Sequence, residues 1–328
     1  MSEQFYAFQT EGEGTGSLIQ RNKEDLPQGE VLIKVHYSGV NYKDGLALHK
    51  KAKIAKDYPM VPGIDLAGTV EHSESPDFSK GQRVICTSYD LGTAHDGGYS
   101  QFARVPAAWV VPLPENLSLR ESMIIGTAGF TAALSIHRLE QNGLTSEDKP
   151  ILVTGASGGV GSMAVDMLAG RGYHVTASTG RLEEEAYLKK LGAAEVIGRE
   201  EVTPEKIRPL DKQKWAAAVD PTGGSVLAAI LSSVKQHGSV AVSGLTAGVE
   251  VPTTVMPFIL RGVDLLGIDS AYCPMPLRKE VWSRCAGSLK PSHMEETATE
   301  IGLDGIQQAL HDILKSKIRG RVIIDVQR

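Results

Sequence analysis

Hydrophobic and polar positions follow two different rhythms along the chain. In the first third, short β-branched runs bounded by Gly, Pro and Asp predict strands at 31–35, 64–70, 83–87, 99–105 and 109–111. A helical spacing follows over 120–139 and ends at Asn142-Gly143, a helix C-cap pattern. From residue 149, apolar strands alternate with helical segments, with strands predicted at 151–154, 174–177, 215–219, 239–242 and 263–268. The pattern predicts a β-rich part followed by a parallel sheet wrapped by helices.

Composition narrows the class of protein. A chain of 328 residues with 41% hydrophobic and 22% charged residues is typical of a soluble protein of about two domains. The net charge of -5 argues against a dedicated nucleic-acid binder. Three cysteines without close C-x-x-C pairs indicate neither a disulfide framework nor a structural zinc site. With no signal-peptide pattern and no apolar run long enough to span a bilayer, we expect a cytoplasmic protein.

A glycine-rich turn follows the strand predicted at 151–154 and opens a helix. It reads Thr154-Gly155-Ala156-Ser157-Gly158-Gly159-Val160-Gly161. Glycines let the backbone approach a pyrophosphate, which the N–H groups and dipole of the helix N-terminus then bind. The strict G-x-G-x-x-G spacing is absent, although 159–164 fits a G-x-G-x-x-A form. Within a run of βα units, this turn predicts a dinucleotide site.

The same turn also fits a second pattern. Residues 155–159 satisfy G-x-S-x-G, the nucleophile elbow of α/β-hydrolases. A hydrolase would need an acid and a histidine after later strands, and Asp220 and His237 are the available residues. Because an elbow does not need the additional glycines of this turn, the dinucleotide interpretation is favoured.

The end of the next strand indicates which dinucleotide. NAD sites usually place Asp or Glu about twenty residues after the turn, but this strand ends Ser178-Thr179-Gly180-Arg181 without an acid. Hydroxyl groups and Arg181 could bind a 2′-phosphate, and Arg199 is a second candidate. The missing acid predicts NADPH, with NADH as the alternative if both arginines are ordinary surface residues.

With these residues in hand, the chain resembles the medium-chain dehydrogenase/reductase superfamily, in its zinc-free quinone-oxidoreductase-like subfamily, and is most similar to the acryloyl-CoA reductase branch. Besides the glycine turn, the matching stretches are 39–44 (Gly-Val-Asn-Tyr-Lys-Asp), 59–68, 124–132 and 251–261. The resemblance implies a β-rich GroES-like catalytic domain, a distorted barrel, over 1–123 completed by 296–328. It implies a Rossmann domain, a doubly wound parallel sheet that binds NADP, over 124–295, with the active site between the domains and a homodimer as the assembly.

Site residues are carried over position by position. The resemblance implies catalytic roles for Tyr42 and Asn41. It implies cofactor contacts from Tyr42, Thr127, Ser157, Gly158, Gly159, Val160, Ser178, Thr179, Gly180, Arg181, Arg199, Leu245, Ile259 and Ser270.

Zinc members of this superfamily carry a Cys where Tyr42 stands and a His-Glu pair where Ile64-Asp65 stands, together with a four-cysteine lobe. This chain has none of these, and a catalytic zinc needs three protein ligands. We therefore expect a metal-free reaction. Asp65 is then expected to be structural, as an acceptor for backbone N–H groups or as a partner of Lys43.

Without a Lewis acid, the substrate must accept hydride at carbon, as an activated alkene does. Tyr42 is the candidate proton donor or oxyanion partner, with simple packing as the alternative, and Asn41 could orient the substrate carbonyl or a water. A basic run of Lys50, Lys51, Lys53 and Lys56 could hold the phosphates of coenzyme A, or be a solvated face.

Three hypotheses follow. The leading one is an NADPH-dependent reductase of a small enoyl-CoA such as acryloyl-CoA. The alternatives are an NAD(P)H quinone or enone oxidoreductase, and a non-catalytic NADPH-binding sensor. Neither nucleic acid nor a membrane is expected as a partner.

Overall fold

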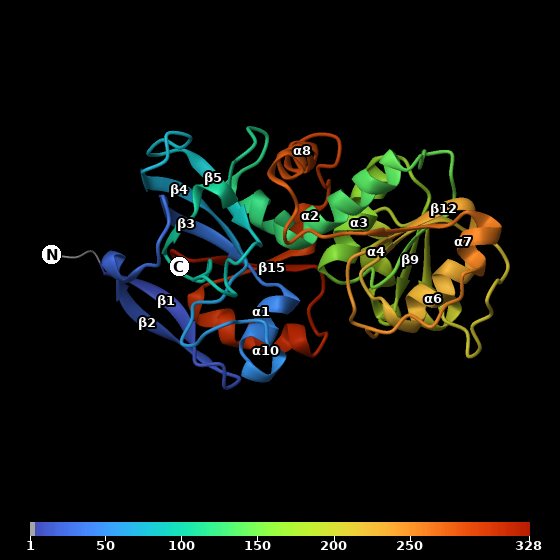
Figure 1. Ribbon diagram of the computed structural model, residues 1–328, viewed down its shortest axis with the longest axis horizontal. Helices are drawn as coiled ribbons and strands as arrows, with labels where there is room; N and C mark the ends of the chain where they lie inside the picture. Colours follow the sequence, from blue (N-terminus) through green and yellow to red (C-terminus); the bar gives the residue numbers. More distant parts are fainter. Residues whose placement is uncertain (1–3) are drawn as a thin grey trace. The chain divides into compact units, whose positions relative to one another are not determined.

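The computed structural model describes residues 4–328, which form two compact units (Figure 1). The first runs to Thr127 and also includes Ala271–Ala286 and Met294–Arg328, and the second comprises Ala128–Ser270 and Gly287–His293. The sequence prediction assigns 271–286 to the Rossmann domain instead. Arg278 explains the difference, because its buried guanidinium donates to the carbonyl and hydroxyl oxygens of Thr87 at 3.0 and 2.9 Å.

Six parallel strands form the sheet of the second unit, in the order β10-β9-β8-β11-β12-β13. The strands are β8 (Ile151–Val153), β9 (Val175–Thr179), β10 (Glu195–Gly198), β11 (Trp215–Asp220), β12 (Val234–Val242) and β13 (Asp264–Gly267). The helices are α3 (Gly159–Gly170), α4 (Glu185–Lys190), α5 (Arg199–Val202), α6 (Gly224–Ser233) and α7 (Met256–Arg261), with a short 3₁₀ turn η4 (Leu182–Glu184). This confirms the predicted doubly wound sheet. Its strand order reverses direction between β8 and β11, and ligands of such sheets bind beyond the carboxyl ends at that point.

The sheet of the first unit is centred on β3 (Val31–Gly39). This strand pairs antiparallel with β4 and β6, and near its end with the C-terminal strand β15. The other strands of this sheet are β4 (Asp65–Ser73), β5 (Arg83–Thr87), β6 (Phe102–Val105), β7 (Val110–Pro112), β14 (Ala298–Ile301) and β15 (Arg321–Asp325). A separate hairpin joins β1 (Gln4–Thr10) and β2 (Gly16–Asn22), which the hydrophobic pattern did not predict.

The remaining elements connect and cover these sheets. They are the helices α1 (Tyr42–Ala47), α2 (Leu119–Gln141), α8 (Met275–Cys285), α9 (Met294–Thr297) and α10 (Ile306–Leu314), and the 3₁₀ turns η1 (Lys23–Asp25), η2 (Lys50–Ala52), η3 (Ala107–Trp109) and η5 (Leu303–Gly305). Within residues 4–328, no helix is both long enough and apolar enough to cross a membrane.

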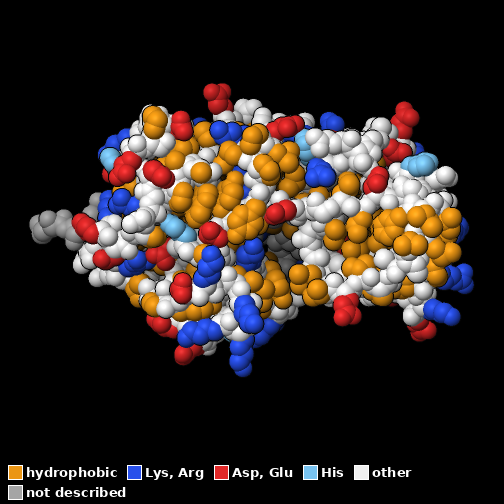
Figure 2. Space-filling view, in the orientation of Figure 1, with side chains coloured by type: hydrophobic (Ala, Val, Ile, Leu, Met, Phe, Trp, Pro, Cys, Tyr) orange, Lys and Arg blue, Asp and Glu red, His pale blue; other side chains and the backbone are white. Residues whose placement is uncertain are grey.

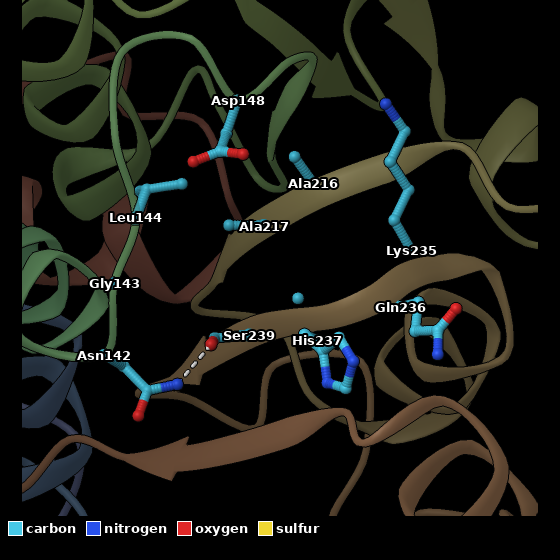
Figure 3. A pocket seen from close by; sticks show the side chains of 11 residues that line it. Asn142, Gly143, Leu144, Asp148, Ala216, Ala217, Lys235, Gln236, His237 and Ser239 are labelled. Atoms are coloured by element: carbon cyan, nitrogen blue, oxygen red, sulfur yellow. Dashed lines mark hydrogen bonds between the residues drawn. The ribbon is translucent and has the colours of Figure 1, made fainter.

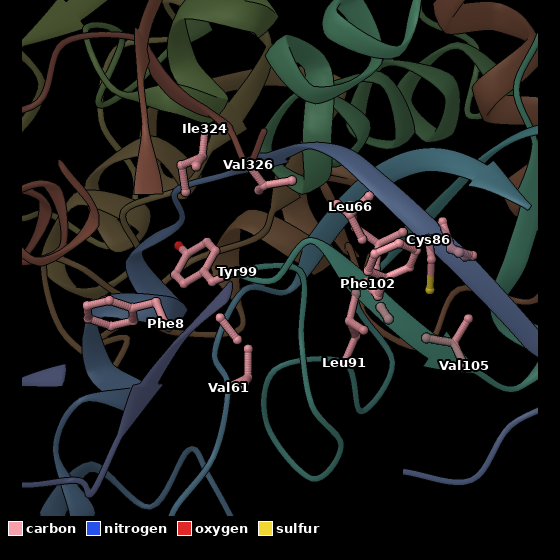
Figure 4. Packing of buried hydrophobic residues seen from close by; sticks show 14 of the residues in the cluster. Phe8, Val61, Leu66, Cys86, Leu91, Tyr99, Phe102, Val105, Ile324 and Val326 are labelled. Carbon is pink, nitrogen blue, oxygen red and sulfur yellow. The ribbon is translucent and has the colours of Figure 1, made fainter. Parts of the chain in front are cut away.

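The core of the first unit is made by strands far apart in sequence. Phe8 and Tyr99 meet edge to face, with ring centroids 6.4 Å apart, and Phe5 and Phe102 do so at 5.6 Å. Side chains of β15 and the residue after it, including Ile324 and Val326, complete this core (Figure 4). The C-terminal strand β15 therefore contributes to the hydrophobic core of the first unit.

Candidate functional site

The glycine turn lies at the carboxyl end of β8, before α3. Gly155 has a left-handed φ of +54°, which favours glycine, and Gly158 caps the helix. A Cβ on Gly161 would lie 2.3 Å from the Gly155 carbonyl oxygen, so this position has no room for a side chain. The turn thus brings the bare backbone and N–H groups of a helix N-terminus to the sheet edge, as a pyrophosphate requires.

A polar corner forms where the glycine turn meets the end of β9. The Ser157 hydroxyl lies 3.0 Å from that of Thr179, and the Arg181 guanidinium donates to Ser157 Oγ and to its carbonyl oxygen at 3.0 and 3.1 Å. Arg199 also lies close to Gly180, since a Cβ there would meet its guanidinium at 2.4 Å. Two cations thus flank a position without an acid, which suits an added phosphate.

The other predicted cofactor residues differ in how much of each side chain is exposed. Ser178 is buried at the end of β9, while Val160 is half-buried in the first turn of α3. The Thr131 hydroxyl donates to Ser270 Oγ at 2.7 Å. Leu245 and Ile259 are 59% and 72% exposed, so their predicted cofactor contacts are free to form but are not preformed by packing.

Asn41 and Tyr42 lie where β3 ends and α1 begins. Tyr42 is the first residue of the helix and is 41% exposed, whereas Asn41 is buried. The Asn41 amide nitrogen donates to Asp65 Oδ2 at 2.8 Å, and its oxygen accepts from Arg321 at 3.1 Å. Both ends of the amide are therefore fixed, next to a tyrosine that is open to solvent.

Asp65 is the centre of this cluster and is fully buried. It accepts the Thr127 backbone N–H at 2.9 Å and the Thr127 hydroxyl at 2.5 Å, and Arg321 lies 3.5 Å from it. Among the residues that the structure describes, its partners are thus Thr127, Asn41 and Arg321, whereas the expected partner Lys43 is not one of them. Gly126 must be glycine here, because its φ is +51° and a Cβ would lie 2.7 Å from the Asp65 carboxylate.

Two further residues of the cluster were missed in the sequence. Arg321 is buried and also donates to the carbonyl oxygens of Ile124 and Val40 at 3.1 and 3.0 Å. Asp44 is fully buried and accepts N–H groups of Asn41 and Ile64. A signal existed for Arg321, since it directly precedes the apolar run 322–324, and Asp65 likewise adjoins apolar residues on both sides.

Burial shifts the pKa values of two charged groups in the cluster. Desolvation, and then the charge of Asp65, raises the pKa of Asp44 to about 7, although two N–H donors oppose this. Desolvation also lowers the pKa of Arg321, while the charge of Asp65 opposes that change. The cluster therefore contains one carboxyl group that titrates near neutral pH, two residues from Tyr42.

Comparisons with known proteins agree with this geometry. The family model of the alcohol dehydrogenase GroES-like domain matches residues 27–115, and that of the zinc-binding dehydrogenases matches residues 159–285. Putative quinone oxidoreductase YhfP of Bacillus subtilis is 58% identical over 302 residues, which are 92% of each chain. Its crystal structure with NAD bound has a TM-score of 0.97 at 55% identity and covers 99% of this chain and 100% of that one.

Two further relatives carry different names. Acrylyl-CoA reductase AcuI of Ruegeria pomeroyi is 47% identical over 315 residues, 96% of each chain. The yhdH oxidoreductase of Salmonella enterica in complex with NADP has a TM-score of 0.95 at 44% identity, with 99% of this chain and 100% of that one covered. The chain belongs to the medium-chain dehydrogenase/reductase superfamily. Its relatives place it in the branch that contains quinone oxidoreductases and acrylyl-CoA reductases.

Membership in this superfamily of oxidoreductases argues against the hydrolase alternative, and so does the geometry of the second unit. Asp220 binds the turn that follows β11, through the backbone N–H groups of Thr222 and Gly223. His237 lies in the amino-terminal half of β12, whereas Ser157 follows the carboxyl end of β8. His237 lines a cavity of about 280 Å³ together with Asn142, Asp148 and Ser239 (Figure 3). Ser157, Asp220 and His237 therefore do not form a catalytic triad.

The superfamily also has zinc members, and the residues at their ligand positions differ here. Asp65 belongs to the hydrogen-bonded cluster described above, and Tyr42 is the exposed neighbour of Asn41. Over residues 4–328, no group of three His, Cys, Asp or Glu side chains could hold a metal ion. The positions that hold zinc elsewhere instead carry the exposed phenol of Tyr42, the side chain of Ile64 and the buried carboxylate of Asp65.

Proposed function

We propose that the protein is an NADPH-dependent reductase that transfers hydride to the activated C=C bond of a small enoyl thioester such as acryloyl-CoA, without a metal. The observation that carries this proposal is the Asn41 amide, fixed at both ends by Asp65 and Arg321 beside the exposed Tyr42. An amide fixed in this way suits the orientation of a substrate carbonyl by hydrogen bonding.

The residues of the second unit fit the cofactor. Gly158 and Gly161 leave the backbone bare, and Arg181 and Arg199 flank Gly180 where a 2′-phosphate would bind. The bound nicotinamide supplies one hydride for the β-carbon of the alkene. NADP is bound in the Salmonella relative and NAD in the Bacillus one, so the two arginines are the proposed basis of a preference for NADPH.

The catalytic residues act on the developing enolate. As hydride adds to the β-carbon, negative charge develops on the thioester oxygen, which hydrogen bonds from the protein stabilise. The second N–H of the Asn41 amide can orient this oxygen, and the Tyr42 hydroxyl can donate a hydrogen bond to it or a proton to the α-carbon. Thr127 keeps Asp65, and through it Asn41, in place.

The experiment is a steady-state screen of NADPH oxidation with acryloyl-CoA, crotonyl-CoA and a quinone. The proposal expects turnover with acryloyl-CoA that persists after exhaustive chelation and falls at least tenfold in Asn41→Ala, while NADPH binding is unchanged. Turnover with the quinone alone would favour the second candidate, a quinone oxidoreductase, which the name of the Bacillus relative supports. NADPH binding without any turnover would instead favour a sensor.

We also propose that the protein is a cytoplasmic homodimer. Cys86, Cys273 and Cys285 are buried free thiols, as suits a reducing compartment. The edge strand β13 pairs only with β12 in the described sheet and carries Leu265, which is 40% exposed. A second copy could pair with this edge. Leu265→Lys should then yield a monomer in analytical ultracentrifugation, and a parent protein that is already monomeric would refute the dimer.

A further inference from the structure

Cations of the first unit gather over α1 and α10, in the lower middle of Figure 2. One part of this group lies on residues 43–56, with exposed Lys50, Lys51, Lys53 and Lys56. The other part follows α10, with exposed Lys315, Lys317 and Arg319. We call these seven residues together with Lys43 the cationic face. Within 43–56 the single carboxylate is the buried Asp44, the exposed Asp57 follows Lys56 directly, and 315–319 contains no carboxylate.

Packing brings the two parts together. A Cβ on Gly45 of α1 would lie 2.9 Å from Leu314 and 3.1 Å from Ile313 of α10, so glycine allows the two helices to approach closely. The basic run that the sequence shows at 50–56 is therefore extended by three cations from a segment more than 250 residues away. In a chain of net charge -5, this concentrates positive potential on one side of α1.

The backbone holds the cationic face in a defined position. The Lys50 N–H donates to the Gly12 carbonyl and that of Lys56 to the Thr93 carbonyl, each at 2.9 Å. Lys53 and Ser316 have left-handed φ values of +56° and +55°, which glycine would adopt at lower cost. Lys53 thus ends η2 in a turn conformation, which fixes the direction of the chain between Lys50 and Lys56.

The nearby acids offset only part of this charge. Lys50 lies 3.8 Å from Glu13, and Lys317 lies 4.0 Å from Asp312. In both pairs the lysine is more than half exposed and the separation is long, so the pairs are weak. Cations at the end of α10 also favour the helix dipole, so Lys315 and Lys317 have a structural use as well. The experiment must separate that use from ligand binding.

We infer that the cationic face binds the phosphate groups of a coenzyme A thioester whose acyl end reaches Tyr42. The face begins at Lys43, the residue after Tyr42, and a quinone has no charge that it could recognise. This inference rests on the proposed reduction of an enoyl thioester, and it names the residues that would select coenzyme A as the carrier. Flexible lysines around a polyanion give attraction that depends on ionic strength.

The test compares acryloyl-CoA with acryloyl-pantetheine, which has the same thioester but lacks the phosphates and the nucleoside. In the parent protein, kcat/KM should be at least tenfold higher for acryloyl-CoA, and added salt should reduce this advantage. Lys51→Glu and Lys315→Glu should each raise the KM for acryloyl-CoA about threefold, and together about tenfold. Values for acryloyl-pantetheine and the KM for NADPH should stay unchanged.

Lys80→Glu is the matched control, since Lys80 is an exposed lysine of the same unit on the turn between β4 and β5. It should change neither substrate. Equal effects of the two test variants on both thioesters would show a role in folding and overturn the inference. Equal kcat/KM for both thioesters in the parent protein would identify the face as merely solvated.

Failure of the proposed function is a separate outcome. If no thioester is reduced, binding of free coenzyme A is measured by equilibrium dialysis, with NADP⁺ present in saturating amount to block the site at the glycine turn. Binding that weakens about tenfold in the double variant would support the cationic face without the reaction. Absence of binding in the parent protein would overturn both.

Discussion

The glycine turn draws its residues from one stretch of eight, whereas the Asn41 cluster draws Asn41, Asp65, Thr127 and Arg321 from four separate segments. The turn acts through bare backbone at a helix N-terminus. It therefore requires no charged side chain to be buried. The cluster buries a carboxylate and a guanidinium, and each charge must be compensated by groups from other strands. A site made of backbone is therefore local and tolerant of change elsewhere, while a site made of buried charges depends on the whole first unit.

The largest effect should come from removing one charge of the cluster. Arg321→Met leaves Asp65 buried with fewer partners, and we expect a loss of about 3–5 kcal/mol in the free energy of unfolding. Arg120→Met is the control, because Arg120 binds Glu295 and Glu300 in a partly exposed position and should cost at most about 1 kcal/mol. Urea unfolding of the three proteins measures both values. If both variants lose the same free energy of unfolding, Arg321 in the buried cluster contributes no more to stability than Arg120 at the surface.

The glycine turn should show the opposite behaviour, with binding lost and the fold retained. Gly159→Val places a branched side chain where the pyrophosphate approaches, so NADPH affinity should fall at least about 100-fold. Gly170→Val, at the other end of the same helix, has open space around its Cβ and should bind NADPH as the parent does. Fluorescence titration gives the affinities and thermal unfolding tests the fold. Tight binding by a folded Gly159→Val protein would contradict a pyrophosphate site here.

The choice of cofactor tests the polar corner of the same unit. A charge-assisted contact is worth about 1.5–3 kcal/mol, so Arg181→Ala should weaken NADPH roughly tenfold to a hundredfold and leave NADH nearly unchanged. Arg171→Ala is the control, because Arg171 pairs with Glu140 on the surface and should alter neither affinity. If the parent protein uses both cofactors with equal catalytic efficiency and Arg181→Ala changes nothing, the protein does not prefer NADPH. Neither Arg181 nor Arg199 would then select the cofactor.

The most gradual effect concerns the pH dependence of the first unit's stability. The folded-state pKa of Asp44 is raised to about 7 from 3.8, so the folded protein keeps a proton that the unfolded chain loses. Stability from this group is present at low pH and is lost as pH rises through about 4 to 7, with a slope of at most about 1.4 kcal/mol per pH unit. Asp65, Tyr99 and Arg321 are the titratable groups coupled to it.

Asp44→Asn should flatten this slope, since an amide does not titrate. Asp57→Asn, on the exposed loop before β4, should keep the slope of the parent protein. The free energy of unfolding measured in urea at several pH values between 5 and 8 gives each slope. A slope that persists in Asp44→Asn would assign the proton to another group of the cluster.

Periodicity and turn chemistry predicted most of the parallel sheet. Strands such as 151–154 and 215–219 were predicted because buried parallel strands read as apolar runs between helical patterns. The hairpin of β1 and β2 was missed, because its outer strand is mostly exposed and lacks a clear alternation. The four-residue strand β14 was missed because its pairing partner β15, and not its own composition, makes it a strand.

The sequence by itself determined the doubly wound sheet, the glycine turn and the end of β9 that lacks an acid, because each depends on neighbours within a few residues. It also singled out Asn41, Tyr42 and Asp65, through the resemblance to a family. Only the tertiary structure decided that Asp65 binds Thr127 and Arg321, and that the cations of 315–319 join those of 43–56. Contacts between segments hundreds of residues apart leave no periodic trace in the chain, since they arise when β15 pairs with β3 and α10 packs against α1.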